Sequence, residues 1–181
     1  MEMKNDIERV LLTQEEIAAK VQELGAQISR DYEGKNLLLV SVLKGSVVFM
    51  ADLMRAINIP CRIDFMAASS YSSGTVHKSL KIIKDLDIDL AGYDLLLVED
   101  ILDSGRTLYN LRELLQTRGP RSIHIATLLD KPERREVDIH SDYCCFDIPD
   151  RFVVGYGLDY DEKYRNLPYI GVLSPKVYGG Q

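Results

Sequence analysis

The stretch from Leu95 to Thr107 constrains the fold more than any other part of the sequence. It begins with an uninterrupted apolar run, typical of a parallel strand that is buried on both faces. Two acids and then small or hydroxyl-bearing residues follow the run: Glu99, Asp100, Ser104, Gly105 and Thr107. Because ligands of parallel sheets bind beyond the carboxyl ends of the strands, the sequence predicts an α/β fold with a ligand site here.

The residue types after this strand suit a sugar phosphate. Gly105 lets the backbone approach a ligand closely, and the N–H groups that open the following helix favour an anion. Glu99, Asp100 and Asp103 would repel a bare phosphate, but carboxylates accept hydrogen bonds from vicinal hydroxyls and hold magnesium together with substrate phosphates. The predicted ligand is therefore a ribose 5-phosphate unit. In a simpler interpretation the acids only cap the helix expected over 107–118, which requires one acid and not three.

This stretch resembles the signature of the type I phosphoribosyltransferases. Four further segments resemble, in order, the remaining blocks of the bacterial-type hypoxanthine-guanine phosphoribosyltransferases: 43–46, 68–71, 128–131 and 152–160. The resemblance covers nearly the whole chain. It implies an α/β fold of type I phosphoribosyltransferase architecture, with a mainly parallel central sheet flanked by helices and a small hood.

The resemblance also implies an activity. The 5-phosphoribosyl group of phosphoribosyl pyrophosphate is transferred to N9 of hypoxanthine, guanine or both, giving IMP or GMP and pyrophosphate, with Mg²⁺ as cofactor. This is a pentosyltransferase reaction of purine salvage. Two alternatives stay open: an RNA-binding transcription attenuator of the same fold, and a phosphoribosyltransferase for xanthine, adenine or uracil. The sequence does not rank hypoxanthine, guanine and xanthine.

By the same resemblance, each block is assigned a task. Asp103 is the catalytic residue, a general acid or base near purine N7. Contacts to the ribose and its 5-phosphate are assigned to Glu99, Asp100, Asp103, Ser104, Gly105, Arg106 and Thr107. Contacts to the purine are assigned to Lys131, which donates to the 6-oxo group, and to Phe152, Val153 and Leu158. Pyrophosphate contacts are assigned to Lys44, Gly45 and Arg165, magnesium contacts to Glu99, Asp100 and Asp159, and the closing loop to Ser70 and Tyr71.

Several of these residues have simpler interpretations. Asp103 could cap the next helix, and Lys131 could be a surface lysine in the charged turn 131–135. The apolar pattern alone would make Phe152 a core residue. Without the resemblance, Asp159 and Arg165 are ordinary surface charges. The resemblance also implies a non-proline cis peptide near Lys44-Gly45 in many relatives, which a sequence cannot show.

Composition limits the classes of partner. The formal net charge is −6, which disfavours nucleic-acid binding, and no apolar run is long enough to span a membrane. The three cysteines are an odd number, and the N-terminal residues lack a signal-peptide pattern, so we expect a reducing cytoplasm. The expected assembly is a homodimer or homotetramer.

The pattern along the chain predicts the following elements. Helices are expected over 13–32, up to 57 and over 107–118, and strands over 37–42, 62–68, 81–86, 95–99 and 122–129. A mobile loop is expected over 69–79. Short apolar pieces at 143–146, 152–154 and 169–173 suggest the cap. With 181 residues the chain fits a single domain, with its core at about 14–140 and the hood at about 1–13 and 141–181.

Overall fold

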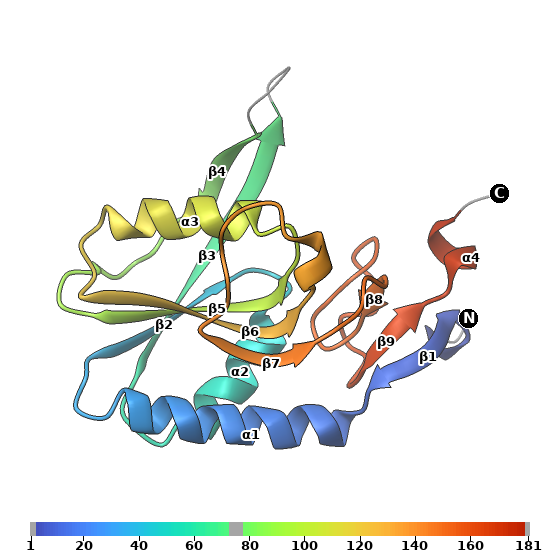
Figure 1. Cartoon of the computed structure of the whole chain (residues 1–181), viewed down its shortest axis with the longest axis horizontal. Coiled ribbons are helices and arrows are strands. Elements are labelled where there is room, and N and C mark those ends of the chain that lie inside the picture. The colour runs from blue at the N-terminus through green and yellow to red at the C-terminus, as the bar shows by residue number, and fades with distance from the viewer. Residues whose placement is uncertain (1–2, 73–77, 180–181) are drawn as a thin grey trace.

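A six-stranded, mainly parallel sheet forms the centre of the molecule (Figure 1). The structure is a computed structural model that describes residues 3–72 and 78–179. The strands of this sheet are β2 (Leu37–Val42), β3 (Arg62–Ser72), β4 (Lys78–Lys84), β5 (Asp94–Leu102), β6 (Ser122–Asp130) and β7 (Tyr143–Asp147). Their order is β4-β3-β2-β5-β6-β7, and only the β3–β4 pair is antiparallel. The predicted α/β fold class is confirmed.

Helices cover both faces of this sheet. In Figure 1, α1 (Gln14–Asp31) and α2 (Val47–Ala56) lie on one face and α3 (Arg106–Gln116) lies on the other. Successive strand residues alternate between the two resulting cores: Leu37 and Leu39 pack with α1 and α2, whereas Leu38 and Val40 pack with α3. Because both faces are covered, strands such as β2 are buried along their whole length, which explains their unbroken apolar sequences.

The first helix begins at a capping box. The Glu16 N–H donates to Thr13 Oγ1 over 3.1 Å, and the Thr13 N–H donates to Glu16 Oε2 over 2.7 Å. The helix then buries a stripe of residues at helical spacing: Ile17, Val21, Leu24 and Ile28. The boundaries predicted from this pattern are confirmed to within one residue.

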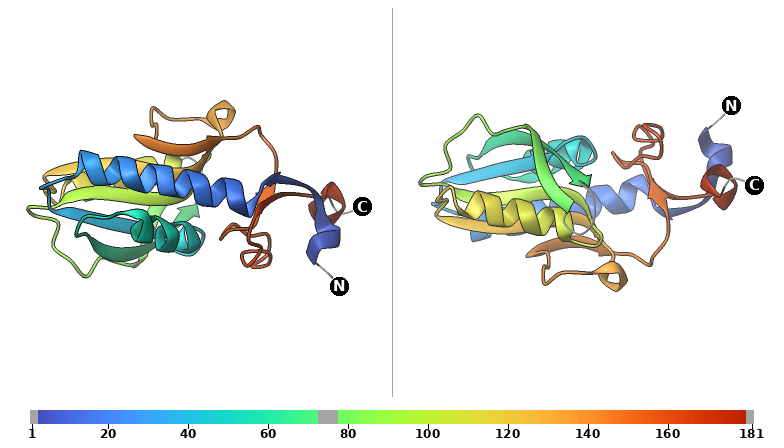
Figure 2. Two further views of the ribbon diagram at one scale, coloured as in Figure 1. Left: turned by 90° about the horizontal axis from the view of Figure 1, so that it is seen from below. Right: turned by 90° about the horizontal axis from the view of Figure 1, so that it is seen from above.

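A second, smaller sheet lies beside the carboxyl end of the main one. It consists of β1 (Ile7–Leu12), β9 (Ile170–Leu173) and β8 (Val153–Val154), all antiparallel. The 3-10 helix η1 (Met3–Asp6) precedes it and α4 (Pro175–Tyr178) follows it. Figure 2 shows this group, with both ends of the chain, at the end of the long helix α1. No helix in the described ranges has the length and apolarity needed to cross a membrane.

The prediction for 143–146 is wrong. These residues were expected in the cap, but they belong to β7, which pairs in parallel with β6 at the edge of the main sheet. The connection between the two strands contains only the 3-10 helix η2 (Pro132–Arg134). Parallel neighbours are normally joined by a helix, so a sequence without a helical pattern after residue 131 gave no indication of a further parallel strand.

The prediction of a loop over 69–79 is also wrong in its described parts. Ser69, Ser70, Tyr71 and Ser72 continue β3 and pair with β4, for example Ser70 with Leu80. Residues 73–77 lie outside the described residues. The β2–β3 pairing ends at Met66, so beyond this point β3 and β4 form a two-stranded arm, which extends past the body of the sheet in Figure 1. Small and polar residues gave no apolar alternation from which to predict this arm.

Candidate active site

At the carboxyl edge of the main sheet, the loop after β2 meets the end of the neighbouring strand β5 and the segment after β8. The approach between them is close. A Cβ atom added to Gly45 would lie 1.9 Å from Asp100 Oδ2, and one added to Gly157, whose φ is +100°, would lie 2.2 Å from the Gly45 carbonyl oxygen. A side chain at Gly45 would have to displace the Asp100 carboxylate, whereas glycine is required at Gly157 by both space and backbone conformation.

The loop after β2 contains a non-proline cis peptide bond between Leu43 and Lys44. It lies one bond before the Lys44-Gly45 position at which the resemblance implied such a bond. Leu43 and Gly45 both line the cavity described next.

A first cavity of about 260 Å³ lies where the loops after β2 and β5 meet. Of the residues predicted to bind the phosphoribosyl group, those that line it are Glu99, Asp100, Asp103, Ser104, Gly105 and Thr107. Arg106 does not line it, and its guanidinium pairs with Glu136. The N-cap of α3 is Gly105, at φ +82°, and the Arg106 N–H of its first turn donates to Ser104 Oγ over 3.5 Å and not to one of the acids. The interpretation of the acids as helix caps is therefore wrong.

The acid pair has unusual electrostatics. Burial, reinforced by the neighbouring Asp100 charge, raises the pKa of Glu99 well above its ordinary value. Burial also raises the pKa of Asp100 to about 6, although the Ile101 N–H and the Arg165 charge oppose the rise. Both carboxylates are thus costly to keep ionised by themselves, and a cation or a hydrogen-bonding ligand beside them would favour the ionised form.

A second cavity, of about 360 Å³, adjoins the first. Ile101 and Asp103 line both. The other residues around the second cavity are Lys131, Arg134, Asp150, Phe152, Val153, Leu158 and Asp159. All four residues predicted to contact a purine are therefore brought to one cavity, next to the residues predicted to contact a ribose phosphate. Ile101 was missed in the sequence because an apolar residue in an apolar strand carries no distinguishing signal.

Lys131 is a buried lysine and not part of an exposed turn, since only 7% of its surface is accessible. Burial lowers the pKa of its ammonium, while the charges of Asp103 and Asp150 act in the opposite direction. Its Nζ lies 3.9 Å from Asp150 Oδ1, which is longer than a hydrogen bond. The ammonium consequently retains donor capacity for a ligand in the cavity.

Asp103 is paired with a residue that the sequence did not indicate. Arg134 Nε lies 2.7 Å from Asp103 Oδ1, and Arg134 Nη1 lies 3.4 Å from Asp150 Oδ1. The pairing places one guanidinium between two carboxylates at the rim of the second cavity. The charged run 131–135 was the available signal, but it did not distinguish which of its residues faces Asp103.

Phe152 is 39% exposed and lines the second cavity, so it is not an interior core residue. Its ring stacks on Tyr178 of α4, with centroids 4.9 Å apart, and meets Tyr160 edge to face at 5.6 Å. Aromatic stacking of this kind fixes the orientation of a ring. The C-terminal helix therefore supports the residue predicted to stack on a base.

Arg165 lies at the edge of this region and has several anionic partners. Its Nη2 is 3.1 Å from Asp159 Oδ1 and 3.0 Å from Glu162 Oε1, and its Nη1 donates to the Gly157 carbonyl. Lys44 Nζ donates to the same Glu162 carboxylate, at Oε2. The two cations predicted to bind pyrophosphate thus meet on Glu162, a residue to which sequence analysis assigned no role.

The donor set suits magnesium supplied together with a substrate. Carboxylate oxygens are the ligands that Mg²⁺ prefers, and Glu99 and Asp100 border a cavity with room for further oxygens. In the described part of the chain, one group of three potential ligand side chains has its ligand atoms within 4.8 Å of one another: Asp130, Cys144 and Asp147. Glu99, Asp100 and Asp159 do not form such a group, so they would hold the ion only together with oxygens from a bound substrate.

Ser70 and Tyr71 lie in the arm formed by β3 and β4, where the structure describes only their backbone. Their predicted closure over a ligand remains a prediction.

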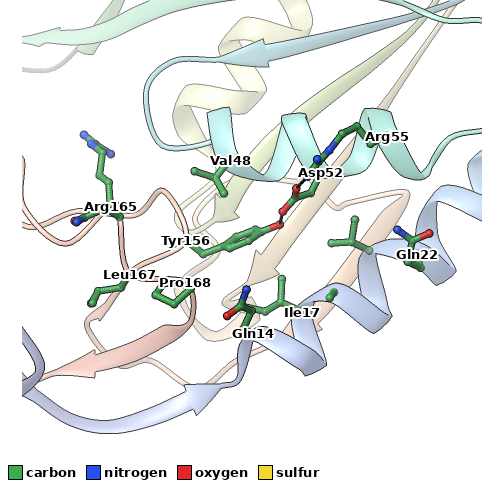
Figure 3. Close-up of a pocket in the computed structure, with 13 residues that line it drawn as sticks. Gln14, Ile17, Gln22, Val48, Asp52, Arg55, Tyr156, Arg165, Leu167 and Pro168 are labelled. Atoms are coloured by element: carbon green, nitrogen blue, oxygen red, sulfur yellow. Dashed lines mark hydrogen bonds and ion pairs between the residues drawn. The ribbon is translucent and has the colours of Figure 1, made fainter.

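Another cavity, of about 670 Å³, lies between α1, α2 and the segment after β8 (Figure 3). The Tyr156 hydroxyl donates to Asp52 there, and Arg165 is drawn at the opposite side of the view from Arg55. Arg165 is the only predicted site residue around this cavity. Neither the carboxyl end of a parallel strand nor the acid pair Glu99 and Asp100 lines this cavity, so the cavity lacks the chemistry of the predicted site.

Comparisons with known proteins identify a family and several relatives for the chain. Residues 10–161 match the model of the phosphoribosyl transferase domain. The chain is 53% identical over 177 residues to a hypoxanthine-guanine phosphoribosyltransferase of Streptococcus thermophilus, covering 97% of this chain and 98% of that protein. It is 55% identical, with the same coverage, to one from Bacillus subtilis. A crystal structure of a hypoxanthine phosphoribosyltransferase from Staphylococcus aureus superposes with a TM-score of 0.94 at 54% identity, covering 97% of this chain and 96% of that one.

Proposed function

The chain belongs to the phosphoribosyltransferase family, and we propose that it transfers the 5-phosphoribosyl group of phosphoribosyl pyrophosphate to N9 of hypoxanthine or guanine. The products are IMP or GMP and pyrophosphate, and the reaction belongs to purine salvage. The observation that carries the proposal is the pair of adjoining cavities that share Ile101 and Asp103. One has the carboxylates and hydroxyls for a ribose phosphate, and the other has a donor and an aromatic ring for a base.

Catalysis requires positioning and charge compensation, because the ribose acquires oxocarbenium character as pyrophosphate leaves. Glu99 and Asp100 bind the ribose hydroxyls, and Ser104, Gly105 and Thr107 bind the 5-phosphate. Lys44 and Arg165 neutralise the pyrophosphate. Asp103 handles the proton at purine N7, with Arg134 holding its carboxylate.

Mg²⁺ is the proposed cofactor, held by Glu99, Asp100 and Asp159 through carboxylate oxygens or bound water. When bound, it supplies positive charge to the pyrophosphoryl oxygens. We further propose a homodimer or homotetramer in the cytoplasm, where the three free cysteines remain reduced. No partner of nucleic acid or membrane type is part of the proposal.

A panel of bases tests the proposed substrate. Hypoxanthine, guanine, xanthine, adenine and uracil are each supplied with phosphoribosyl pyrophosphate and Mg²⁺, and nucleotide formation is measured. We expect turnover with hypoxanthine and guanine. Turnover with adenine or uracil alone, or RNA binding in the absence of turnover, would contradict the proposal.

Lys131→Met tests the base cavity, because methionine matches the length of lysine without its ammonium. We expect kcat/KM for hypoxanthine to fall by a factor equivalent to about 1 to 3 kcal/mol of transition-state stabilisation, as for a missing hydrogen bond to a buried group. Discrimination against adenine should weaken. The dissociation constant of phosphoribosyl pyrophosphate should stay unchanged. The exposed Lys163→Met is the matched control, and equal weakening of both substrates would make Lys131 a structural residue.

A further inference from the structure

One carboxylate holds both cations of the proposed pyrophosphate site. Lys44 Nζ lies 2.8 Å from Glu162 Oε2, and Arg165 Nη2 lies 3.0 Å from Glu162 Oε1. Lys44 follows β2, whereas Glu162 and Arg165 come from the segment after β8, so the three meet only in the folded chain. Each oxygen of the carboxylate has its own cation.

The backbone holds Glu162 in this position. Glu162 has a φ of +59°, and its neighbour Asp161 has a φ of +52°, values that residues other than glycine rarely adopt. The Glu162 N–H donates to Asp159 Oδ2 over 2.9 Å, and Tyr160 and Lys163 exchange backbone hydrogen bonds around the turn. Non-glycine residues in this conformation persist where the surrounding structure fixes them. The turn thus presents Glu162 to the two cations.

The bridging carboxylate has the chemistry of the anion proposed for this place. A carboxylate and a phosphate present oxygen pairs of similar geometry to a guanidinium fork and an ammonium. Hydrogen bonds from Lys44 and Arg165 hold the pKa of Glu162 below its usual range, so the group is ionised. At 63% exposure its side chain can leave the cations without breaking a packed core.

We propose that Glu162 is a further residue of the pyrophosphate site, an internal competitor that occupies Lys44 and Arg165 until a pyrophosphoryl group displaces it. The inference rests on the proposed function. Glu162 keeps the two cations close together in the free protein, and it returns to them when pyrophosphate leaves. It therefore sets the affinity for pyrophosphate and shortens the time for which the product stays bound.

The test compares Glu162→Gln with Asp161→Asn. Asp161 is adjacent, also has a positive φ and carries the same charge, but it pairs with Lys163 and not with Lys44 or Arg165. Pyrophosphate is titrated into each full-length protein in Mg²⁺ buffer by calorimetry. Since one exposed ion pair changes an equilibrium by up to about fivefold and Glu162 makes two such pairs, we expect Glu162→Gln to bind pyrophosphate about three- to tenfold more tightly.

The product-inhibition constant of pyrophosphate in the transfer assay should fall by the same factor, and Asp161→Asn should stay within about twofold of the wild type in both measurements. Equal or weaker binding by Glu162→Gln overturns the inference, because Glu162 would then only position the cations. An equal gain in Asp161→Asn also overturns it, because the effect would be one of net charge. If the wild type neither catalyses transfer nor binds pyrophosphate, the proposed function is refuted together with the inference. If the wild type is active and Glu162→Gln binds pyrophosphate as the wild type does, the inference alone is refuted.

Discussion

Asp103 is the residue at which the two cavities meet, and its environment separates a catalytic from a structural role. The first N–H of α3, from Arg106, donates to Ser104 Oγ and not to Asp103, whose carboxylate pairs with Arg134. An isosteric change to asparagine removes the ionisable group and leaves the cavity shape intact. The change should therefore lower the rate of the chemical step while leaving the stability of the fold almost unaltered.

We predict that Asp103→Asn loses about 10²- to 10⁴-fold in the chemical step, the range typical of a general acid or base. The measurement is a single-turnover experiment with hypoxanthine, and the melting temperature should change little. Asp150→Asn is a matched control, because Asp150 also pairs with Arg134 and lines the second cavity. A rate within a few-fold of wild type for Asp103→Asn would remove this residue from proton transfer at N7.

At the scale of single elements, α1 connects the small sheet to the main one and begins at a reciprocal cap. We predict that Thr13→Ala lowers the free energy of unfolding by about 1 kcal/mol, because an N–H of the first turn loses its acceptor. Urea denaturation measures the loss, and Thr13→Ser should retain most of the stability. Transfer activity should be unchanged, since Thr13 lines neither of the two site cavities.

The arm of β3 and β4 should be less stable than the body of the main sheet. Among the residues that the structure describes, β3 beyond Met66 pairs with β4 alone, and an isolated two-stranded ribbon is marginal in water. We predict rapid amide exchange at 69–72 and 78–80 in the free protein, and protection when substrates bind and the arm closes. Hydrogen exchange followed by mass spectrometry measures both states, with Leu95–Val98 of β5 as the protected reference. Exchange in the arm that is insensitive to substrates would exclude a closing role.

At the scale of the whole molecule, the site combines the loops after β2, β5 and β6 with the segment around β8. The carboxylates that would hold Mg²⁺ do not form a preformed cluster in the described residues, so ion and substrate should depend on each other. We predict that phosphoribosyl pyrophosphate raises the affinity for Mg²⁺ by about 5- to 150-fold, the usual range of coupling between ligands.

Calorimetric titration of Mg²⁺ with and without phosphoribosyl pyrophosphate measures this coupling. Asp100→Asn should reduce it, whereas Asp87→Asn, an exposed carboxylate paired with Lys84, should not. Equal Mg²⁺ affinity with and without phosphoribosyl pyrophosphate would contradict the prediction.

The sequence by itself predicted the parallel strands β2, β3, β5 and β6 of the central sheet and placed the candidate site at their carboxyl edge. Apolar runs buried on both faces, the capping box before α1 and the acids after Val98 are local patterns, because backbone geometry links residues only a few positions apart. Parallel strands bring their carboxyl ends to one edge, so loops far apart in the sequence could be placed together.

Only the tertiary structure decided which charges meet. Arg134 on Asp103 and Glu162 between Lys44 and Arg165 depend on how loops pack, and the sequence around each charge would suit an exposed position equally well. The same holds for β7, whose parallel pairing follows a connection without an α-helix, and for the β3–β4 arm. The charge pairs are non-local, because each joins segments distant along the chain. The β3–β4 arm pairs neighbouring segments, but their small and polar residues show no apolar alternation.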